Sequence, residues 1–325
     1  MASSGPSPFL LGVNYPWLDY AEDFGCGPRG HLGVSSTEKY ERVKRDFADM
    51  RACGVRVVRW FLFGDGRGGF SSKNGIPRRP DEFLLKDVAA ALQLAQAYEL
   101  QLCFSLIDHL WLQDRELART AEPHERVLQF AAGREALLQY VLLPLFTAFR
   151  EHPALFAWEV ANEPEWAIRE FHRDPAAKLP YADFRAFAAE VVKAIHEYGR
   201  ASATLGSARL LWLRAWSELQ LDFYQAHYYP STERDLRQSL PQQLSGLRSI
   251  DKPLWLGEIP AHDTFDPGYS LEGVLTECLI HKLHGAAVWR WTKPEAAGSD
   301  TMIGSVEPVV IQTWLASQRM QELSA

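Results

Sequence analysis

Short apolar segments alternate with amphipathic helical segments along almost the whole chain, and this alternation limits the folds open to it. Eight segments rich in β-branched and aromatic residues have the length of strands, and most are apolar throughout rather than at every second residue. Continuous apolar strands are typical of parallel sheets that are covered on both faces. The predicted strands are 9–15, 55–63, 101–107, 155–161, 203–212, 223–228, 254–257 and 286–291. The sequence therefore predicts an α/β protein built around a parallel sheet.

Segments with apolar residues at helical spacing separate nearly all of these strands. The predicted helices are 38–52, 81–100, 133–151, 181–198, 233–247 with an interruption at Pro241, 271–283 and 308–323. The fifth unit is the weak point, since residues 212–222 leave little room for a helix. Eight strand–helix units in a chain of 325 residues predict one closed (β/α)8 barrel. We expect a single catalytic domain over residues 1–325, with 1–8 as a disordered tail.

An open, doubly wound sheet is the alternative to a closed barrel. Such a sheet carries a glycine-rich phosphate-binding turn after an early strand. The glycines at 64, 66, 68 and 69 follow the second predicted strand, but they do not have the G-x-G-x-x-G spacing and no helix begins directly after them. We interpret this segment as a flexible surface loop and favour the barrel.

Composition excludes several classes of function. The net charge is −7, without any basic run, so neither nucleic acid nor an anionic membrane surface is an expected partner. The four cysteines are scattered without a CxxC pair, so we expect core thiols rather than disulfides or a structural zinc site. Neither a signal peptide nor a membrane-spanning run is evident, so we expect a cytoplasmic protein. The alternative is a secreted protein whose leader has been lost. The oligomeric state stays open.

Polar and aromatic residues gather where the predicted strands end. In a (β/α)8 barrel the catalytic groups come from the carboxyl ends of the strands. Two carboxylates, Glu163 after the fourth strand and Glu258 after the seventh, are expected to face each other across the mouth of the barrel. Paired carboxylates in a groove lined by Trp and Tyr suit the hydrolysis of glycosides, and indole rings stack on sugar faces.

The motifs at these strand ends resemble those of clan A glycoside hydrolases, especially family 5. They are Trp158-Glu-Val-Ala-Asn-Glu-Pro164, Arg56-Val-Val-Arg-Trp60, His227-x-Tyr229-Pro230, Lys252-Pro-Leu-Trp-Leu-Gly-Glu258 and the strand that carries Trp289. They occur in the order and spacing of that family and cover nearly the whole chain. The second and fourth strands are most similar to those of the β-mannanases within this cellulase-like and mannanase-like family.

The resemblance implies a role for each matching residue. Glu163 would be the acid/base and Glu258 the nucleophile of a retaining β-glycosidase, acting on mannan- or glucan-type chains or on a glycoconjugate. Asn162 would bond the sugar 2-hydroxyl, and His227 would contact the substrate or the acid/base. Arg59 and Tyr229 would hold Glu258, and Trp289 would form the floor of the −1 subsite, the position of the sugar that is transferred to the enzyme.

Further residues are expected near the cleft from their position alone. His109 and its neighbour Asp108 are either a substrate-binding pair or a structural pair at a strand end. Among the many tryptophans, Trp111 and Trp166 are the ones we expect to line subsites. Glu159 has the strand parity of Glu163 but lies four residues deeper, so we expect it to bond inside the barrel.

Two further expectations concern ionisation and a competing carboxylate. A cationic Arg59 favours ionised Glu258, while apolar neighbours such as Trp158 or Trp166 would raise the pKa of Glu163. Glu165 lies beyond the strand end, where we expect it to be solvated.

Three other functions compete with a hydrolase. A metal-dependent barrel hydrolase usually presents His-x-His on its first strand, where this chain has Val13-Asn14-Tyr15, so neither a metal nor another cofactor is expected. A non-catalytic carbohydrate-binding barrel would keep the aromatic groove but lose a carboxylate. A transglycosylase would use the same two carboxylates to pass the sugar to another hydroxyl.

Overall fold

The computed structural model describes residues 9–324 apart from several gaps. The gaps are 28, 65, 67, 74–75, 113–126, 129, 172, 174–176, 178, 234–235, 237, 248, 264–265, 267, 292–305 and 307. The predicted disordered tail, residues 1–8, therefore lies outside the described residues.

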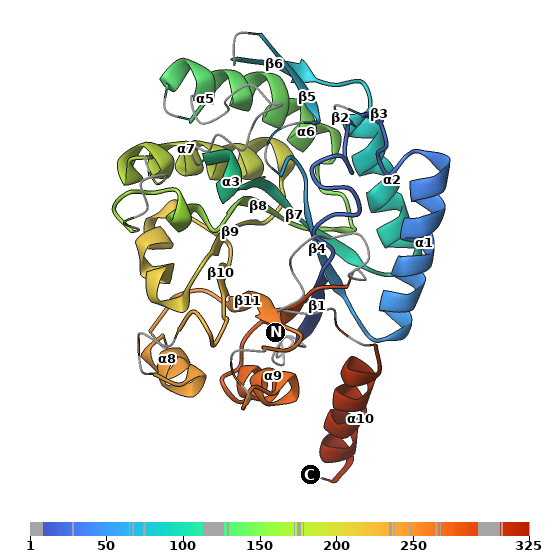
Figure 1. Ribbon diagram of the computed structural model, residues 1–325, viewed down its shortest axis with the longest axis vertical. Coiled ribbons are helices and arrows are strands. Elements are labelled where there is room, and N and C mark those ends of the chain that lie inside the picture. The colour runs from blue at the N-terminus through green and yellow to red at the C-terminus, as the bar shows by residue number, and fades with distance from the viewer. Residues whose placement is uncertain are drawn as a thin grey trace, which may run out of the picture.

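Eight parallel strands close into a barrel, as the alternation predicted (Figure 1). The strands follow one another around the barrel in sequence order, and the last pairs with the first. They are β1 Leu10–Asn14, β4 Val57–Phe61, β7 Gln101–Asp108, β8 Leu155–Asn162, β9 Ala203–Ser207, β10 Tyr224–His227, β11 Leu254–Pro260 and β12 Gly285–Trp289. Every residue of β4 and of β9 to β12 is buried, which explains the continuous apolar runs in the sequence.

Helices surround the barrel, and their amphipathic faces pack against the strands (Figure 1). They are α1 Thr37–Ala52, α2 Leu84–Ala97, α3 His109–Leu112, α5 Ala131–Leu137, α6 Leu143–Ala148, α7 Tyr181–Ala194, α8 Leu240–Gly246, α9 Leu271–Ile280 and α10 Pro308–Ser324. The π-helix Leu138–Leu142 joins α5 to α6, and the π-helix Ile195–Gly199 follows α7. In α1, for example, Val43, Phe47 and Met50 are fully buried, and their spacing of four and three places them on one face.

Some predicted boundaries are wrong, each for a local reason. The fifth strand ends at Ser207, and a 3₁₀-helix at Leu210–Leu219 fills the place where no helix was expected. Its buried residues recur every three positions, which is the 3₁₀ period and not the α period. Pro241 does not interrupt a helix. It lies in the first turn of α8, where a missing N–H costs nothing.

Two small antiparallel sheets lie outside the barrel and were not predicted. They are β2 Cys26–Gly27 with β3 Gly30–His31, and β5 Phe70–Lys73 with β6 Ile76–Pro80. The interpretation of the glycine-rich segment as a flexible surface loop is wrong, because Gly64, Gly66, Gly68 and Gly69 are buried and β5 begins directly after them. Cys26 is exposed on β2, so the prediction of a core thiol is wrong there, whereas the other three cysteines are buried; all four are free.

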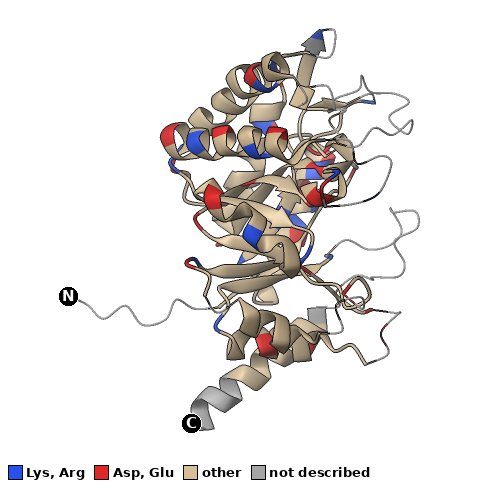
Figure 2. Ribbon diagram, turned by 90° about the vertical axis from the view of Figure 1, so that its left-hand side faces the viewer, with Lys and Arg blue, Asp and Glu red and all other residues tan. Residues whose placement is uncertain are grey.

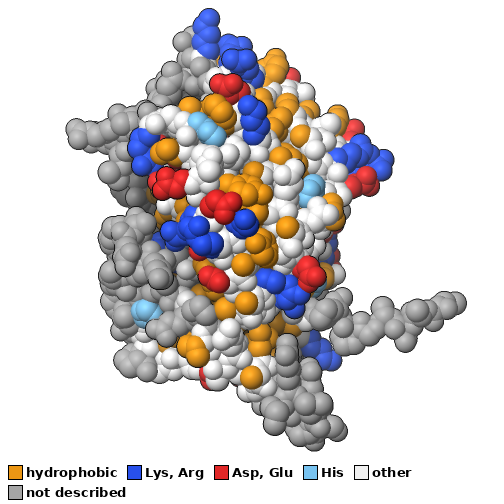
Figure 3. All heavy atoms as spheres, turned by 90° about the vertical axis from the view of Figure 1, so that its right-hand side faces the viewer, with side chains coloured by type: hydrophobic (Ala, Val, Ile, Leu, Met, Phe, Trp, Pro, Cys, Tyr) orange, Lys and Arg blue, Asp and Glu red, His pale blue; other side chains and the backbone are white. Residues whose placement is uncertain are grey.

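The surface carries charges of both signs. Lys and Arg positions lie among Asp and Glu positions along the outer helices (Figure 2), and the side chains on the face in Figure 3 show the same mixture. Within the described part of the chain, none of the helices combines the length and the apolar character that crossing a membrane requires.

Candidate active site

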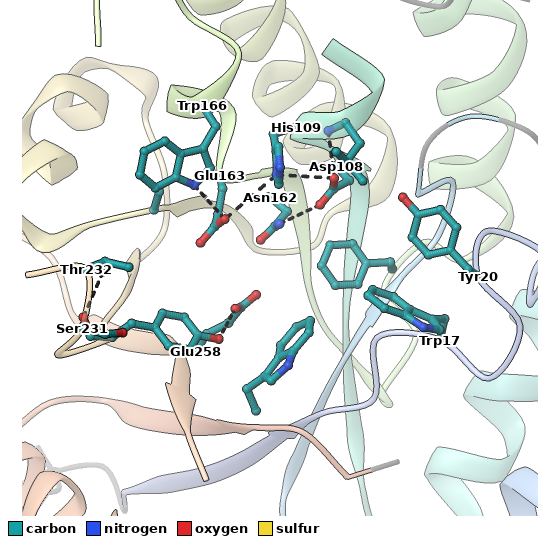
Figure 4. A pocket seen from close by; sticks show the side chains of 15 residues that line it. Trp17, Tyr20, Asp108, His109, Asn162, Glu163, Trp166, Ser231, Thr232 and Glu258 are labelled. Atoms are coloured by element: carbon teal, nitrogen blue, oxygen red, sulfur yellow. Dashed lines mark hydrogen bonds and ion pairs between the residues drawn. The ribbon is translucent and has the colours of Figure 1, made fainter. Parts of the chain in front are cut away.

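A cavity of about 390 Å³ opens at the carboxyl ends of the barrel strands (Figure 4). Each of the eight strands, or the segment directly after it, supplies a residue to its wall. The volume lies within the range of small-molecule sites, about 300–1,000 Å³. The position is the one at which (β/α)8 barrels carry their reactive groups.

Glu163 and Glu258 point toward each other across this cavity (Figure 4). One carboxylate oxygen of each residue and a ring nitrogen of His227 all lie within 4.8 Å of one another. Glu258 is 5% exposed, at the carboxyl end of β11. The structure thus brings together the two carboxylates that the sequence placed 95 residues apart.

Glu163 is held by its backbone as well as by its side chain. It follows β8 in the left-handed conformation, with φ 48° and ψ 45°, which a residue other than glycine adopts only under constraint. Its N–H donates to the carbonyl of Gly206 at 2.7 Å. The indole N–H of Trp166 donates to Oε2 at 2.9 Å, and Nδ1 of His227 lies 2.7 Å from Oε1. The carboxylate is therefore aimed before any substrate arrives.

Arg59 lies fully buried directly beneath the cavity and uses all five of its N–H groups. Nε and Nη2 donate to the carboxylate of Glu159, each at 2.6 Å. Nη1 donates to Glu258 Oε1 at 2.6 Å and to Asn14 Oδ1 at 2.9 Å, and Nη2 also donates to Asn162 Oδ1 at 2.7 Å. The predicted contact of Arg59 with Glu258 and the predicted burial of Glu159 are both observed.

Tyr229 also holds the carboxylate of Glu258 in place. Its hydroxyl donates to Glu258 Oε2 at 2.7 Å, as the sequence predicted. Burial, with the charge of Glu258, raises the pKa of this phenol well above its usual range, so the hydroxyl keeps its hydrogen and acts as a donor.

The pKa directions of the two carboxylates are the reverse of what the sequence suggested. Burial, with the negative charge of Glu163, raises the pKa of Glu258 by more than His227, Arg59 and the hydrogen bond from Tyr229 lower it. Burial also favours neutral Glu163, but the hydrogen bond from His227 and its charge outweigh this effect and lower the pKa of Glu163. For His227, burial is outweighed by the negative charges of Glu258 and Glu163, which raise its pKa.

Asn162 has both ends of its amide fixed. Its oxygen accepts from Arg59, and its nitrogen donates to Asp108 Oδ2 at 2.7 Å. One N–H of the amide therefore remains to point at a ligand. His109 lies next to this pair, with Nδ1 at 3.4 Å from Asp108 Oδ1 and 4.0 Å from Glu163 Oε2.

Glu163, His227 and Glu258 are also the one group among the described residues whose donor atoms are close enough together for a metal ion. Their spacing suits hydrogen bonding better. Two ligands at about 2.1 Å from a tetrahedral metal lie more than about 3 Å apart, whereas His227 Nδ1 and Glu163 Oε1 are 2.7 Å apart. His227 and Glu163 already share a hydrogen bond, which occupies one donor atom of each.

The remaining predicted site residues divide into two groups. His109, Trp166 and Trp289 line the cavity. Trp111 does not: it is 2% exposed and stacks on Phe70 with ring centroids 5.6 Å apart. The unpredicted sheet β5–β6 supplies that phenylalanine, and it covers the tryptophan that the sequence placed near the cleft.

The expectation for Glu165 is wrong as well. Its side chain is fully buried and accepts hydrogen bonds from Ser207, Trp216 and the N–H of Ala208. Burial raises its pKa. The three donors lie at the end of β9 and in the segment that follows it, and these residues exclude solvent from the Glu165 carboxylate.

Several lining residues were not predicted. They are Tyr20, Phe61, Leu110, Ala208, Ser231 and Thr232. Phe61 could have been found, because it lies two residues after Arg59 and shares its strand face. Ser231 and Thr232 directly follow the motif at the end of β10. Tyr20 lies in the long segment after β1, where no sequence pattern marks it.

A closed barrel with two facing carboxylates over an aromatic-lined cavity defines the class of barrel glycoside hydrolases. Comparison with known proteins agrees with this class, because the curated proteins that match the chain are named as mannanases. No family model matches the sequence.

Curated relatives bear the name mannan endo-1,4-beta-mannosidase. The protein from Mytilus edulis is 27% identical over 174 residues, which are 51% of this chain and 42% of that protein. The protein from Cryptopygus antarcticus is 22% identical over 328 residues and covers 88% of this chain and 81% of its own length.

Solved structures share the fold. The β-mannanase of Mytilus edulis superposes with a TM-score of 0.72 at 21% identity, covering 95% of this chain and 92% of its own. The β-1,4-D-mannanase of Cryptopygus antarcticus gives 0.75 at 20% identity, covering 96% and 91%. A family 5, subfamily 18 protein of Streptomyces cattleya, solved with Manβ1-4GlcNAc, gives 0.69 at 16% identity, covering 96% and 81%.

Proposed function

We propose that this chain is a retaining β-glycosidase that cleaves β-linked mannan chains, with Glu163 as the acid/base and Glu258 as the nucleophile. The observation that carries the proposal is the separation of less than 4.8 Å between their carboxylate oxygens. Retaining glycosidases hold these groups about 5–5.5 Å apart, and inverting ones about 6.5–9.5 Å apart. The short separation leaves no room for an attacking water between Glu258 and the sugar, so it favours attack by Glu258 itself.

The reaction takes two steps. In the first, Glu258 attacks the anomeric carbon while Glu163 gives its proton to the leaving glycosidic oxygen, which forms a glycosyl-enzyme ester. In the second, Glu163 removes a proton from water, the water attacks the same carbon, and the carboxylate of Glu258 is released. The two inversions together retain the configuration.

The proton for the first step is shared between Glu163 and His227. The raised pKa of His227 and the lowered pKa of Glu163 place it on the imidazole in the free enzyme. The two atoms are 2.7 Å apart, so the proton passes to Glu163 when the leaving oxygen approaches. Activity is then expected between the raised pKa of Glu258, below which the nucleophile is neutral, and the raised pKa of His227, above which the shared proton is lost.

The cavity has two sides with different chemistry (Figure 4). The leaving group must lie beside the acid/base, which places it toward Trp166, Ser231 and Thr232. The retained sugar then lies toward Trp17 and Tyr20. Aromatic rings on that side suit the faces of sugar rings, and the free N–H of Asn162 suits the 2-hydroxyl group.

Mannan is the substrate that the relatives favour, because the curated proteins that match this chain are named as mannan endo-1,4-beta-mannosidases. Soluble β-mannan, mannooligosaccharides, β-glucan, aryl β-mannosides and β-glucosides, and Manβ1-4GlcNAc form the panel that tests it. We expect turnover of the mannan substrates first, with a β-anomeric product seen by NMR before mutarotation.

The same panel is run with Glu163→Gln, Glu258→Ala and a matched control, Glu272→Gln, whose glutamate is exposed on α9. Both site variants should lose at least about 10³-fold in kcat/KM, since each removes a group that acts in the transition state, while the control keeps its activity. Azide added to Glu258→Ala should yield the α-glycosyl azide. Sugar binding without turnover in the parent would instead support a carbohydrate-binding barrel, and azide rescue with inversion in Glu163→Ala would exchange the two roles.

A further inference from the structure

Glu159 is a fully buried carboxylate that no part of the proposed chemistry uses. It lies on β8, four residues before Glu163, on the side of Arg59 that faces the barrel interior. Its four hydrogen bonds come from three other strands: two from Arg59, one from Ser105 at 2.9 Å and one from Gln225 at 2.6 Å. A carboxylate accepts about four hydrogen bonds, so this group is saturated.

The arrangement makes Glu159, and not the carboxylate in the cavity, the main counter-ion of Arg59. Glu159 takes two of the five N–H groups in a bidentate pair, whereas Glu258 takes one. Burial alone would lower the pKa of the guanidinium, but Glu159, and after it Glu258, raise it. A single arginine therefore serves two carboxylates, and the deeper one has the larger share of its charge.

We infer that Glu159 is a positioning residue, which fixes Arg59 beneath the cavity and, by offsetting its charge, sets the pH range over which Glu258 and Glu163 can act. The inference rests on the proposed function for its meaning in catalysis. Its electrostatic part concerns this chain's own groups and can be measured without substrate.

Other ionisable groups face the same cluster, and none duplicates this role. From β7 come Cys103, Asp108 and, just beyond it, His109, and from β10 and its following segment come His227 and Tyr229. Burial, with the charge of Glu159, raises the pKa of Cys103 well above its usual range, so that thiol is neutral. Among these groups, Glu159 is the one that forms the bidentate pair with Arg59, and it does not line the cavity.

The direction of the pH shift expected for Glu159→Gln follows from the charge that this substitution removes. Glu159→Gln removes a negative charge next to Arg59 and leaves the guanidinium less compensated. The anionic form of Glu258 is then favoured, so its pKa falls and the acidic limb of the pH profile moves to lower pH. The proton shared by Glu163 and His227 is also released more easily, so the basic limb moves the same way.

The test compares the pH dependence of kcat/KM for the parent, Glu159→Gln, Glu159→Asp and Ser105→Ala. We expect both limbs of Glu159→Gln to move to lower pH by about one unit, which is the size of a charge removed at close range. Glu159→Asp, which keeps the charge but weakens the pair, should move them less. Ser105→Ala removes a hydrogen bond to the same carboxylate without changing its charge, and should leave both limbs in place.

Glutamate labelled with ¹³C at Cδ supplies a readout that needs no turnover. The carboxyl signal that disappears in Glu258→Gln is assigned to Glu258, and its titration should move to lower pH in Glu159→Gln. If the limbs of the pH profile and the titration of Glu258 stay at the same pH, and only the rate or the thermal stability falls, Glu159 is a purely structural residue. If Glu159→Gln does not fold, the test rests on Glu159→Asp. A smaller shift of its limbs to lower pH supports the role, and no shift opposes it. An inactive parent whose Glu258 titration still shifts would overturn the proposed function and leave the electrostatic role intact.

Discussion

Tyr229 shows how much a single donor contributes at the residue scale. Among the described residues, its hydroxyl and the guanidinium of Arg59 hydrogen-bond the carboxylate of Glu258. Both favour the ionised form that a nucleophile needs, against the burial that raises its pKa. The ionisation of this site is therefore a balance between burial and a few specific contacts.

Tyr229→Phe removes the hydroxyl and leaves the ring. The hydrogen bond lowers the pKa of Glu258, so its loss should raise that pKa further and move the acidic limb to higher pH. A hydrogen bond to a charged group contributes about 1.5 kcal/mol, so kcat/KM should fall about tenfold and the limb should move by about one unit. The basic limb should stay in place. The measurement is the pH profile of kcat/KM, and a limb that moves to lower pH would contradict this account.

At this scale the sequence predicted which residues meet but not how they ionise. Period-two spacing and the strand ends were enough to place Asn162, Glu163, Tyr229 and Glu258 at one mouth. The pKa directions could not be predicted in the same way, because they depend on how deeply each carboxylate is buried and on its distances to His227 and Arg59. Those distances belong to the folded barrel and leave no mark in a local motif.

At the scale of elements, the short 3₁₀-helix Pro164–Trp166 determines where Glu163 points. It is only three residues long, so its own hydrogen bonds cannot hold it. Glu165 anchors it to the end of β9 and to the segment that follows. The anchor consists of Ser207 Oγ at 2.6 Å, Trp216 Nε1 at 2.7 Å and Ala208 N at 3.1 Å. The left-handed backbone of Glu163 is maintained by this anchor.

Glu165→Ala should therefore reduce both stability and activity. It leaves the buried N–H groups of Trp216 and Ala208 without an acceptor, and each such group costs about 1–3 kcal/mol. We expect a loss of about 3 kcal/mol in the free energy of unfolding, measured with denaturant, and a fall in kcat that exceeds any change in KM.

Glu165→Gln is the matched control for this prediction. It keeps the size of the side chain and one oxygen, and it mimics the neutral carboxyl that the raised pKa favours, so it should lose less than half as much. An alanine variant as stable as the parent would show that the 3₁₀-helix does not depend on the anchor.

Elements with a strong period were predicted well, and those without one were not. The eight strands and α1, α2, α7 and α9 follow from apolar spacing. The 3₁₀-helix at Leu210–Leu219 was missed because its period of three is not the one sought. The sheet β5–β6 was missed because it packs by individual contacts, such as Phe70 on Trp111, and not by a repeating pattern.

On the scale of the whole molecule, the barrel depends on close packing at the seam between its first and last strands. Leu10 pairs with Gly285 there, and a methyl group built on Gly285 would lie 2.1 Å from the carbonyl oxygen of Leu10. A backbone atom cannot move aside as a flexible side chain can. Glycine is therefore required at this position by contact rather than by its backbone angles.

Gly285→Ala should accordingly destabilise the protein by about 3 kcal/mol, at the upper end of the usual range for overpacking. Gly246→Ala is the control, because nothing lies within 4 Å of the added methyl group at the end of α8. That change should leave stability within about 0.5 kcal/mol or raise it, since alanine favours a helix. Equal unfolding midpoints for the two variants would show that the seam tolerates expansion.

Closure through the first strand has a consequence for how the molecule is made. β1 leaves the ribosome early and can pair with β4 soon afterwards, but its other neighbour, at Gly285, emerges 275 residues later. At about 5–20 residues per second, that delay lasts roughly a quarter of a minute to a minute. Throughout it the nascent chain is an open sheet with two unsatisfied edges, which is the form most prone to pair with other chains. The native barrel is thus completed only after Gly285 has been made, and the yield in a cell will depend on what protects those edges in the meantime.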